Sequence, residues 1–396
     1  MSIPMAAKGM ADIPFAGIRK VFEKAARLEK KGQQVIHFEI GRPDFDTPAH
    51  IKAAAVAALD EGMVHYTPNL GVPVLREALA ESLQQYKGIH YDPEREIMAT
   101  AGGQEAMFLS LQAFLNPGDE ILVPNPGYGQ FYSCVKLTGG VPVALPLLAH
   151  ENFAPDLSAA RGLLTDRTRA LIVNSPHNPT GAVLTVEQLE EICRFAAEKG
   201  LVIFSDEAYD RMIYGKDKFF SPAACKDMKN QTVIWGSLSK TYSMTGWRVG
   251  YIAAPKDLIA AAIKVQQNVM LSICSFSQAG AVAALKGDQA CVTRMVDEFD
   301  DRRRLILRGI ENAPGLTCPV TPKGAFYVFA KHDVPAMNTS ELADHLLEKG
   351  GVAVVPGTSF GAGGEGYLRI SYATSSQNCR EGMERIAYAM TLLGRD

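Results

Sequence analysis

Hydrophobic and polar positions alternate in blocks along the middle of the chain, and each block has the pattern of a strand or a helix. Residues 170–174 (ALIVN) form a short continuous apolar run, which is typical of a strand buried on both faces of a sheet. Thr185 and Gln188 have the spacing of a capping box, and apolar residues then follow at helical spacing to Gly200, where we expect the helix to end. Residues 201–205 (LVIFS) are the next apolar run, so this region is predicted to be one βαβ unit.

The same alternation extends beyond that unit. Continuous apolar strands alternating with helices are typical of a mostly parallel sheet that helices cover on both faces. In such sheets ligands bind beyond the carboxyl ends of the strands, so the residues that directly follow the strands are the candidates for a functional site. The further elements that we expect are strands at 120–123, 141–145, 233–236 and 249–253, and a helix at 104–115.

The two ends of the chain have a different pattern, with amphipathic helices and short strands. We expect an α/β fold: a mostly parallel central sheet with helices on both faces, and a smaller α+β domain built from both termini. The predicted boundaries are an N-terminal arm with part of the small domain at 1–45, a large domain at 46–289 and a C-terminal small domain at 290–396. The terminal elements expected are helices at 14–34, 290–312 and 339–350 and strands at 35–40, 324–330 and 367–372.

Composition and charge exclude several other classes of protein. Of the 396 residues, 47% are hydrophobic and 21% are charged, which excludes a disordered or collagen-like chain. The net charge of −3 leaves no basic excess of the kind that nucleic-acid-binding proteins carry. The apolar runs are far too short to span a membrane, and we expect no signal peptide. The 7 cysteines are widely spaced without a CxxC motif, so we expect no disulfide framework, no metal site and a cytoplasmic location.

Lys240 is the first candidate for chemistry, because it lies just beyond the predicted strand 233–236. A lysine removed from bulk water has a lowered pKa, and its free amine becomes a nucleophile towards a carbonyl group. An isolated lysine is more often an ordinary surface residue. Here Arg248 lies eight residues further on, and Ser237 and Ser239 supply hydroxyl groups. This combination suits an aldehyde and a phosphate on one small molecule.

Asp206 and Tyr209 are a second candidate pair, at the end of the predicted strand 201–205. A carboxylate deep in a site can pair with a protonated ring nitrogen, and a phenol three residues later can donate to a phenolate oxygen. Asp206 would equally suit the N-cap of a helix, so the sequence leaves both interpretations open.

Two further segments are candidates for ligand contact because one follows a predicted strand and the other leads into a predicted helix. Residues 174–181 (NSPHNPTG) contain turn-forming pairs and could be an ordinary loop, but two asparagines at a strand end favour ligand contact. We interpret His177 as structural. Residues 100–106 (TAGGQEA) place two glycines before a helix, where backbone N–H groups can bind an anion, although such turns are common. Neither a dinucleotide motif nor an ATP-binding motif is present there.

Taken together, the segments NSPHNPTG, SDEAY and SLSKTYSMTGWRVGY resemble the motifs of fold-type-I aminotransferases, which use pyridoxal 5′-phosphate (PLP). The chain is similar to the class I/II subgroup that includes prokaryotic aspartate, alanine and aromatic aminotransferases, over the range 14–388. The resemblance implies an enzyme that moves the amino group of an L-amino acid to a 2-oxo acid, such as 2-oxoglutarate or pyruvate, by a ping-pong Schiff-base mechanism.

The resemblance also implies roles for individual residues around the cofactor. Lys240 would form the Schiff base and Asp206 would keep the pyridine nitrogen protonated. Tyr209 and Asn178 would bond the cofactor's phenolic oxygen, and Tyr128 would stack on its ring. The implied phosphate-binding residues are Gly102, Gly103, Gln104, Ser237, Ser239 and Arg248. Tyr66 would reach the phosphate of a neighbouring subunit, which implies a homodimer with shared active sites.

For the substrate, the resemblance implies that Arg369 binds the α-carboxylate, with further contacts from Gly41 and Asn178. A carboxylate common to every amino acid calls for a planar bidentate donor, which arginine supplies and lysine does not. Aspartate-type relatives can place a lysine where this chain has Gln104, and Ile18 falls where relatives carry a lid residue. A neutral amide and an apolar lid favour a neutral, aromatic or broad amino donor.

Three alternatives stay open: an aspartate aminotransferase, a C–S β-lyase on the same scaffold, and a PLP-binding regulator that is not an enzyme. Transaminases and lyases share residues of the Lys240, Asp206 and Arg369 type, so the motifs separate them poorly. A regulator would carry an attached helix-turn-helix domain, for which we expect no room before Pro14.

Overall fold

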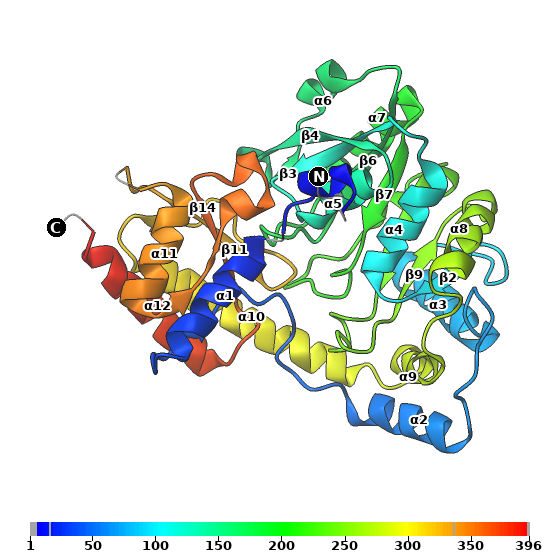
Figure 1. Ribbon diagram of the computed structural model, residues 1–396, viewed down its shortest axis with the longest axis horizontal. Helices are drawn as coiled ribbons and strands as arrows, with labels where there is room; N and C mark the ends of the chain where they lie inside the picture. The colour runs from blue at the N-terminus through cyan, green and yellow to red at the C-terminus, as the bar shows by residue number, and fades with distance from the viewer. Residues whose placement is uncertain (1–5, 16, 336, 394–396) are drawn as a thin grey trace, which may run out of the picture.

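The computed structural model describes residues 6–15, 17–335 and 337–393 of the chain. An eight-stranded sheet with its helices forms one side of the molecule, and the C-terminal helices form the other side together with α1 (Gly17–Glu29) (Figure 1). None of the helices in the described residues is long and apolar enough to span a membrane. The predictions for residues 1–5, 16, 336 and 394–396 lie outside the described residues.

The central sheet has the strand order β2-β9-β8-β7-β6-β3-β4-β5. The neighbours β8, β7, β6, β3 and β4 all pair in parallel, so the predicted mostly parallel sheet is confirmed. Strand β9 runs antiparallel to both of its neighbours, β2 and β8, and the edge strand β5 runs antiparallel to β4. The strands are β2 (Ile97–Thr100), β3 (Glu120–Asn125), β4 (Val141–Leu148), β5 (Ala154–Pro155), β6 (Thr168–Asn174), β7 (Val202–Asp206), β8 (Thr232–Ser237) and β9 (Gly250–Ala253).

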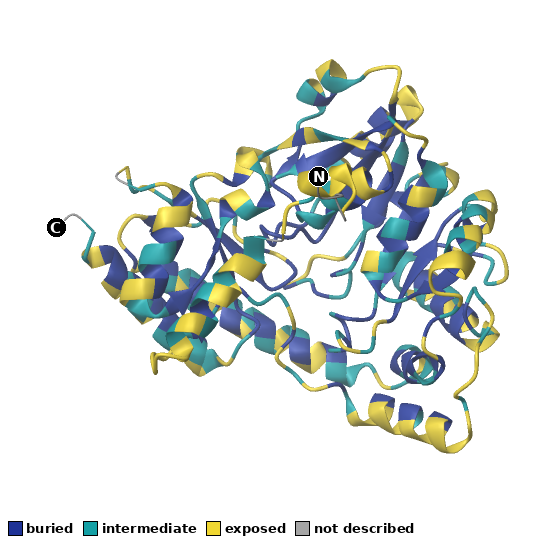
Figure 2. Ribbon diagram, in the orientation of Figure 1, coloured by how far each residue is buried: buried dark blue, intermediate teal, exposed yellow. Residues whose placement is uncertain are grey.

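Helices cover both faces of this sheet because successive side chains of a buried strand point to opposite faces. On β6, Ile172 belongs to an apolar cluster that includes residues of α4, α5 and α8, whereas Leu171 belongs to a second cluster that includes residues of α6 and α7. The buried strands between these helices are dark blue in Figure 2. The helices around the sheet are α2 (Ala49–Asp60), α3 (Pro73–Lys87), α4 (Gly103–Phe114), α5 (Gln130–Leu137), α6 (Leu157–Leu163), α7 (Val186–Lys199), α8 (Lys256–Val269) and α9 (Ser275–Lys286).

The predicted βαβ unit is present as β6, α7 and β7. Both halves of the capping box form: the Thr185 side chain accepts from the Gln188 N–H, and the Gln188 side chain accepts from the Thr185 N–H. Gly200 ends the helix in the left-handed region, with φ +65°, which favours glycine. Local sequence signals therefore set both ends of α7.

The smaller part of the molecule contains segments from both ends of the chain, as expected. Strand β1 pairs in parallel with β12, so the N-terminal region lies against the C-terminal elements. A four-stranded antiparallel sheet has the order β10-β11-β14-β13. The elements here are α10 (Ala290–Glu311), α11 (Thr339–Gly350), α12 (Ser376–Thr391), β1 (Ile36–His37), β10 (Leu316–Thr317), β11 (Tyr327–His332), β12 (Val352–Ala353), β13 (Val355–Pro356) and β14 (Tyr367–Ser371).

Several predicted ends differ from the observed ones. The helix expected at 14–34 spans only Gly17–Glu29, and the strand expected at 35–40 is reduced to Ile36–His37. The chain from there to α2 is irregular, and it is this segment that reaches the candidate site. Short 3₁₀ helices complete the fold: η1 (Lys8–Asp12), η2 (Ala149–Glu151), η3 (Pro222–Ala224), η4 (Lys229–Gln231), η5 (Gly357–Phe360) and η6 (Ala362–Gly364).

Candidate active site

A cavity of about 300 Å³ lies at the carboxyl ends of the central strands. Strands β6, β7 and β8 end side by side, because the register pairs Asn174 with Asp206 and Asp206 with Trp235. Most of the candidate residues line this one cavity, although they come from distant parts of the chain. They are Ile18, Gly41, Gly103, Gln104, Tyr128, Asn178, Asp206, Tyr209, Ser237, Ser239, Lys240, Arg248 and Arg369.

Lys240 lies in the turn that follows β8, and its side chain points into the cavity. Its Nζ donates a hydrogen bond to the Gly41 carbonyl oxygen at 2.6 Å. Burial, followed by the positive charges of Arg369 and Arg248, lowers the pKa of Lys240 to about 8, and Asp206 opposes this shift. A lowered pKa increases the share of free amine near neutral pH, which is the form that reacts with a carbonyl group.

Asp206 is the last residue of β7, is half-buried and lines the cavity. Its Oδ1 accepts the Ala208 N–H at 3.1 Å, but a turn follows rather than a helix, so the N-cap interpretation is wrong. Burial raises the pKa of Asp206 to about 6, and nearby Glu207 adds to the rise while Lys240 opposes it. No Lys, Arg or His among the described residues forms an ion pair with this carboxylate; a cationic ring nitrogen would compensate it.

Arg369 lies on β14 and is 1% exposed. Its Nη1 donates to Asn178 Oδ1 at 3.1 Å and its Nη2 to the Glu39 carbonyl oxygen at 2.6 Å, whereas its Nε has no partner in the described structure. A buried guanidinium with a free N–H and no carboxylate among its hydrogen-bond partners is costly unless a ligand supplies an anion. The arrangement therefore fits a ligand carboxylate.

Tyr209 and Asn178 approach Arg369 from the large sheet. The Tyr209 hydroxyl lies 2.9 Å from the Tyr327 hydroxyl, and the Asn178 N–H donates to Asn174 Oδ1 at 3.0 Å. Burial and the neighbouring Tyr327 raise the pKa of Tyr209 well above its ordinary value, so this phenol stays a hydrogen-bond donor near neutral pH. These contacts join the end of β6 and the turn after β7 to the smaller part of the molecule.

The Gly102–Gly103 turn lies against Arg248 at one corner of the cavity. Helix α4 begins after Gly102, which has φ +83° and provides no side-chain cap for the first N–H groups. A Cβ on Gly102 would lie 2.4 Å from Nη2 of Arg248, so glycine lets the guanidinium approach the helix N-terminus. The Ser237 hydroxyl accepts the Ser239 N–H at 3.2 Å nearby. A helix N-terminus, an arginine and hydroxyl groups together suit a phosphate.

Two candidate residues lie outside the cavity lining. Gly102 lies next to the Arg248 guanidinium without lining the cavity itself. Tyr66 is 85% exposed and lies elsewhere on the surface of the molecule. The single chain therefore does not bring Tyr66 to the other candidates.

Six lining residues were missed by the sequence interpretation. Ala208, Trp235 and Thr245 lie within or beside the recognised motifs, so their place in the sequence could have identified them as lining residues. Tyr327 had no local signal, because it reaches the site only through the pairing of β11 with β14, in which it lies opposite Ser371. The missed residues are Met107, Phe131, Ala208, Trp235, Thr245 and Tyr327.

The fold and the site together define a PLP-dependent transferase of fold type I. A half-buried lysine, a carboxylate without an ion-pair partner among the described residues, a helix N-terminus beside an arginine, and a buried arginine with a free N–H converge at the carboxyl ends of a mostly parallel sheet. The chain belongs to the class I and II aminotransferase family, whose family model matches residues 33–386. It is thus a PLP-dependent aminotransferase, and the predicted family, fold class and cofactor are confirmed.

Similar proteins carry names of more than one amino-acid specificity. The chain is 42% identical to an aspartate aminotransferase of Pyrococcus abyssi over 93% of this chain and 94% of that protein. It is 40% identical to aromatic-amino-acid aminotransferase 2 of Thermococcus litoralis, over 93% of this chain and 94% of that protein. The structure of the aspartate aminotransferase of Thermus thermophilus with maleate superposes with a TM-score of 0.92 at 38% identity, covering 98% of this chain and 100% of that one.

Proposed function

We propose that this aminotransferase takes the amino group from a neutral or aromatic L-amino acid, with broad specificity, and passes it to 2-oxoglutarate or pyruvate. The observation that carries the proposal is the convergence of Lys240, Asp206 and Arg369 on one cavity whose lining includes the neutral Gln104. The names of similar proteins include both aspartate and aromatic aminotransferases, so they support amino-group transfer but do not identify the amino donor. The proposed donor class therefore rests on the residues that line the cavity.

The cavity provides a place for each part of the cofactor. The Gly102–Gly103 turn, Arg248 and the two serines after β8 would hold the phosphate, and Tyr128 would lie against the ring. Asp206 would hold the ring nitrogen in its protonated form, and Lys240 would bind the aldehyde carbon through Nζ. When bound, PLP supplies an electron sink that stabilises negative charge at the substrate Cα.

The remaining steps are carried by side chains of the chain itself. Arg369 would bind the substrate α-carboxylate through its unpartnered Nε, and Asn178 keeps the guanidinium in place through Nη1. The Lys240 amine, once free, can take the proton from the substrate Cα and return it, since burial brings its pKa to about 8.

The distal end of the cavity supports the proposed donor class. Ile18, Met107 and Phe131 provide apolar surface, and the Gln104 amide donates to Cys134 Sγ at 3.3 Å. Lys240, Arg248 and Arg369 are assigned above to the cofactor and the α-carboxylate. Apart from these, the described residues that line the cavity include no cation that could pair with a distal carboxylate.

A half-reaction panel tests the function. PLP-loaded protein is mixed with each amino acid without an oxo acid, and conversion of the cofactor is followed by its absorbance. We expect faster conversion with neutral and aromatic donors than with aspartate, and reversal on addition of 2-oxoglutarate or pyruvate. Release of pyruvate and ammonia without any oxo acid would instead show a C–S lyase.

Gln104→Lys is expected to shift the preference of the enzyme towards aspartate. A charge-assisted contact to the distal carboxylate should increase kcat/KM for aspartate relative to a neutral donor by about 10-fold or more. The matched control is Gln104→Met, which keeps the side-chain length without the charge and should leave the ratio low. An unchanged aspartate ratio in the lysine variant would contradict this assignment of the distal end.

We also propose a homodimer in which Tyr66 reaches the active site of the second copy. Tyr66 is 85% exposed and adjoins the segment after α8, where the Ser272 hydroxyl accepts the Thr67 N–H at 3.4 Å. Val64 and Ser272 line the same surface pocket as Tyr66, and the exposed apolar residues Val269, Met270 and Leu271 directly precede Ser272 in the chain. Such a surface is typical of a subunit interface.

The dimer predicts complementation between two inactive variants. Lys240→Ala and Tyr66→Ala proteins are unfolded together and refolded as a mixture, with each refolded alone as the control. Hybrid dimers would contain one site with both residues intact, so we expect activity to return in the mixture only. A monomeric mass in solution, or no recovery of activity in the mixture, would contradict the shared site.

A cytoplasmic location is proposed from the seven free cysteines and can be checked by cell fractionation.

A further inference from the structure

We infer that Arg302 is a positioning residue for the active site: through Asp44 it holds the segment 39–44, whose carbonyl groups contact Lys240 and Arg369. The inference rests on the proposed function, because it concerns the substrate-binding geometry of the same site. It assigns a task to an ion pair that lies outside the cavity lining, where neither residue would touch the substrate or the cofactor.

Segment 39–44 provides two of the contacts that fix the candidate catalytic side chains. The Glu39 carbonyl oxygen accepts from Arg369 Nη2 at 2.6 Å, and the Gly41 carbonyl oxygen accepts from Lys240 Nζ at 2.6 Å. A Cβ on Gly41 would lie 2.6 Å from the Tyr327 hydroxyl, so the backbone fits closely against that side chain. A shift of the segment would therefore move the partners of both cationic groups.

Regular secondary structure does not hold this segment in place, because β1 ends at His37 and α2 begins only at Ala49. At its N-terminal end the chain is tied by backbone hydrogen bonds: the Phe38 N–H donates to the Ala353 carbonyl and the Ser371 N–H donates to the Phe38 carbonyl. At its other end the tie is a side-chain contact. Arg302 Nη1 donates to Asp44 Oδ1 at 2.6 Å.

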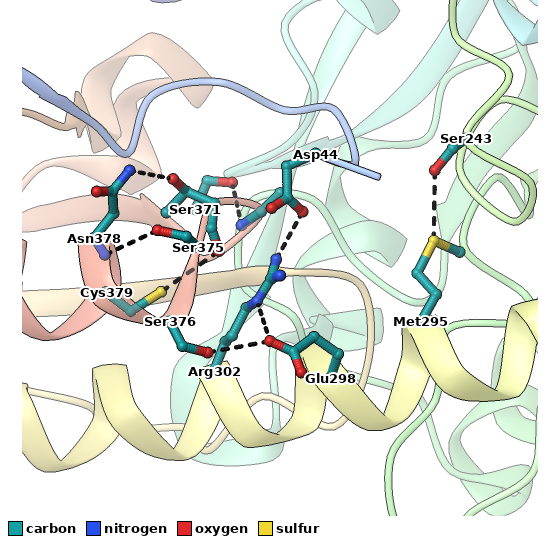
Figure 3. Close-up of polar contacts among 12 residues, drawn as sticks. Asp44, Ser243, Met295, Glu298, Arg302, Ser371, Ser375, Ser376, Asn378 and Cys379 are labelled. Atoms are coloured by element: carbon teal, nitrogen blue, oxygen red, sulfur yellow. Dashed lines mark hydrogen bonds and ion pairs between the residues drawn. The ribbon is translucent and has the colours of Figure 1, made fainter. Parts of the chain in front are cut away.

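Arg302 is built into a network on α10 (Figure 3). Its Nε donates to Glu298 Oε1 at 3.0 Å, and the Ser376 hydroxyl at the start of α12 donates to the same oxygen at 3.1 Å. The Arg302 side chain is 7% exposed, and its guanidinium carbon lies 4.9 Å from the centre of the Phe45 ring. Because the arginine is shielded from water, its contact with Asp44 is screened less than a surface ion pair.

The same face of α10 also supports the turn that carries Lys240. Met295, Glu298 and Arg302 follow one another at helical spacing, so their side chains project from one side of the helix. The Ser243 hydroxyl, three residues after Lys240, donates to Met295 Sδ at 3.5 Å (Figure 3). One helix face thus contacts both the Lys240 turn and the segment whose Gly41 carbonyl oxygen accepts from Lys240.

A matched control is available on the same helix. The Arg304 side chain is 57% exposed, and among the described residues it pairs only with Asp300 and Asp301 of α10 itself. Its loss therefore removes a helix-surface charge without touching segment 39–44. Arg302→Gln, Asp44→Asn, the double variant and Arg304→Gln are therefore compared as PLP-loaded enzymes. Asp44→Asn is the milder change, since the Asp44 side chain is 30% exposed and that of Arg302 only 7%, and it keeps the test open if Arg302→Gln folds poorly.

In steady-state assays, Arg302→Gln and Asp44→Asn are each expected to raise the KM of every amino donor on the order of tenfold, with a smaller change in kcat. The double variant should be no worse than the poorer single variant, because both changes remove one contact. Arg302→Lys, which keeps the charge near Asp44 but loses the fork to Glu298, should have an intermediate KM. Arg304→Gln should match the wild type.

Amide hydrogen exchange gives a readout that does not depend on turnover. Backbone amides of residues 38–45 should exchange faster in Arg302→Gln and Asp44→Asn than in the wild type or Arg304→Gln. Unchanged KM values in both single variants, or effects that multiply in the double variant, would overturn the positioning role. Failure of the proposed function would show in the wild type itself, which would not convert amino donors, whereas failure of this inference shows only in the comparison between variants.

Discussion

Lys240→Ala is expected to lower the rate of the half-reaction with any amino donor by about 10³-fold or more. Nζ of Lys240 is the amine that the turn after β8 places in the cavity, and the described lining contains no second lysine that could replace it. The phosphate corner is untouched by the change, so the cofactor should still bind, but without a covalent link. Single-turnover absorbance measurements give both the rate and the bound state.

Lys323→Ala is the matched control for this prediction. Lys323 is an exposed lysine paired with Asp217 at 2.9 Å, so its loss should leave the half-reaction unchanged. A Lys240→Ala protein that keeps more than about one tenth of the wild-type rate would contradict the assignment of the proton-transfer role to Nζ.

Arg369→Lys is expected to raise the KM of every amino acid by a similar factor of about 100. The expected contact is to the α-carboxylate, which all the donors share, and a lysine cannot reproduce the planar fork that also holds Asn178 and Glu39. Steady-state kinetics with one neutral, one aromatic and one acidic donor measure the effect. Arg304→Gln serves again as the control for the loss of an arginine.

The pattern across donors decides what Arg369 contacts. An equal rise in KM for all three donors supports the α-carboxylate contact. A loss confined to the acidic donor would place Arg369 at the distal side chain instead, and the proposed preference for neutral and aromatic donors would then have no basis.

The parts of the fold and site that the sequence predicted are those that local patterns encode. Buried apolar runs revealed β6, β7 and β8, and the rule that ligands lie beyond strand ends pointed to Asp206 and Lys240. Sequence patterns did not reveal that β9 is antiparallel, because a strand buried on both faces has the same apolar run in either direction. Strand β2 was missed because its last residue, Thr100, was interpreted as part of the glycine turn before α4.

The parts that could not be predicted depend on contacts between distant segments. Tyr327 meets Tyr209 only because the smaller part of the molecule packs beside the strand ends. Asp44 and Arg302 are 258 residues apart, and neither lies in a motif that singles it out. The role of Tyr66 needs a second copy of the chain, since within one chain it lies on the surface.

The covalent link between Lys240 and the cofactor is tested most directly by peptide mapping. PLP-loaded protein is reduced with borohydride, digested and analysed by mass spectrometry, with Lys240→Ala protein treated in parallel. We predict a pyridoxyl label on the peptide that contains Lys240, and none in the variant. A label on another lysine, or an unlabelled wild-type protein, would contradict the assignment of this site.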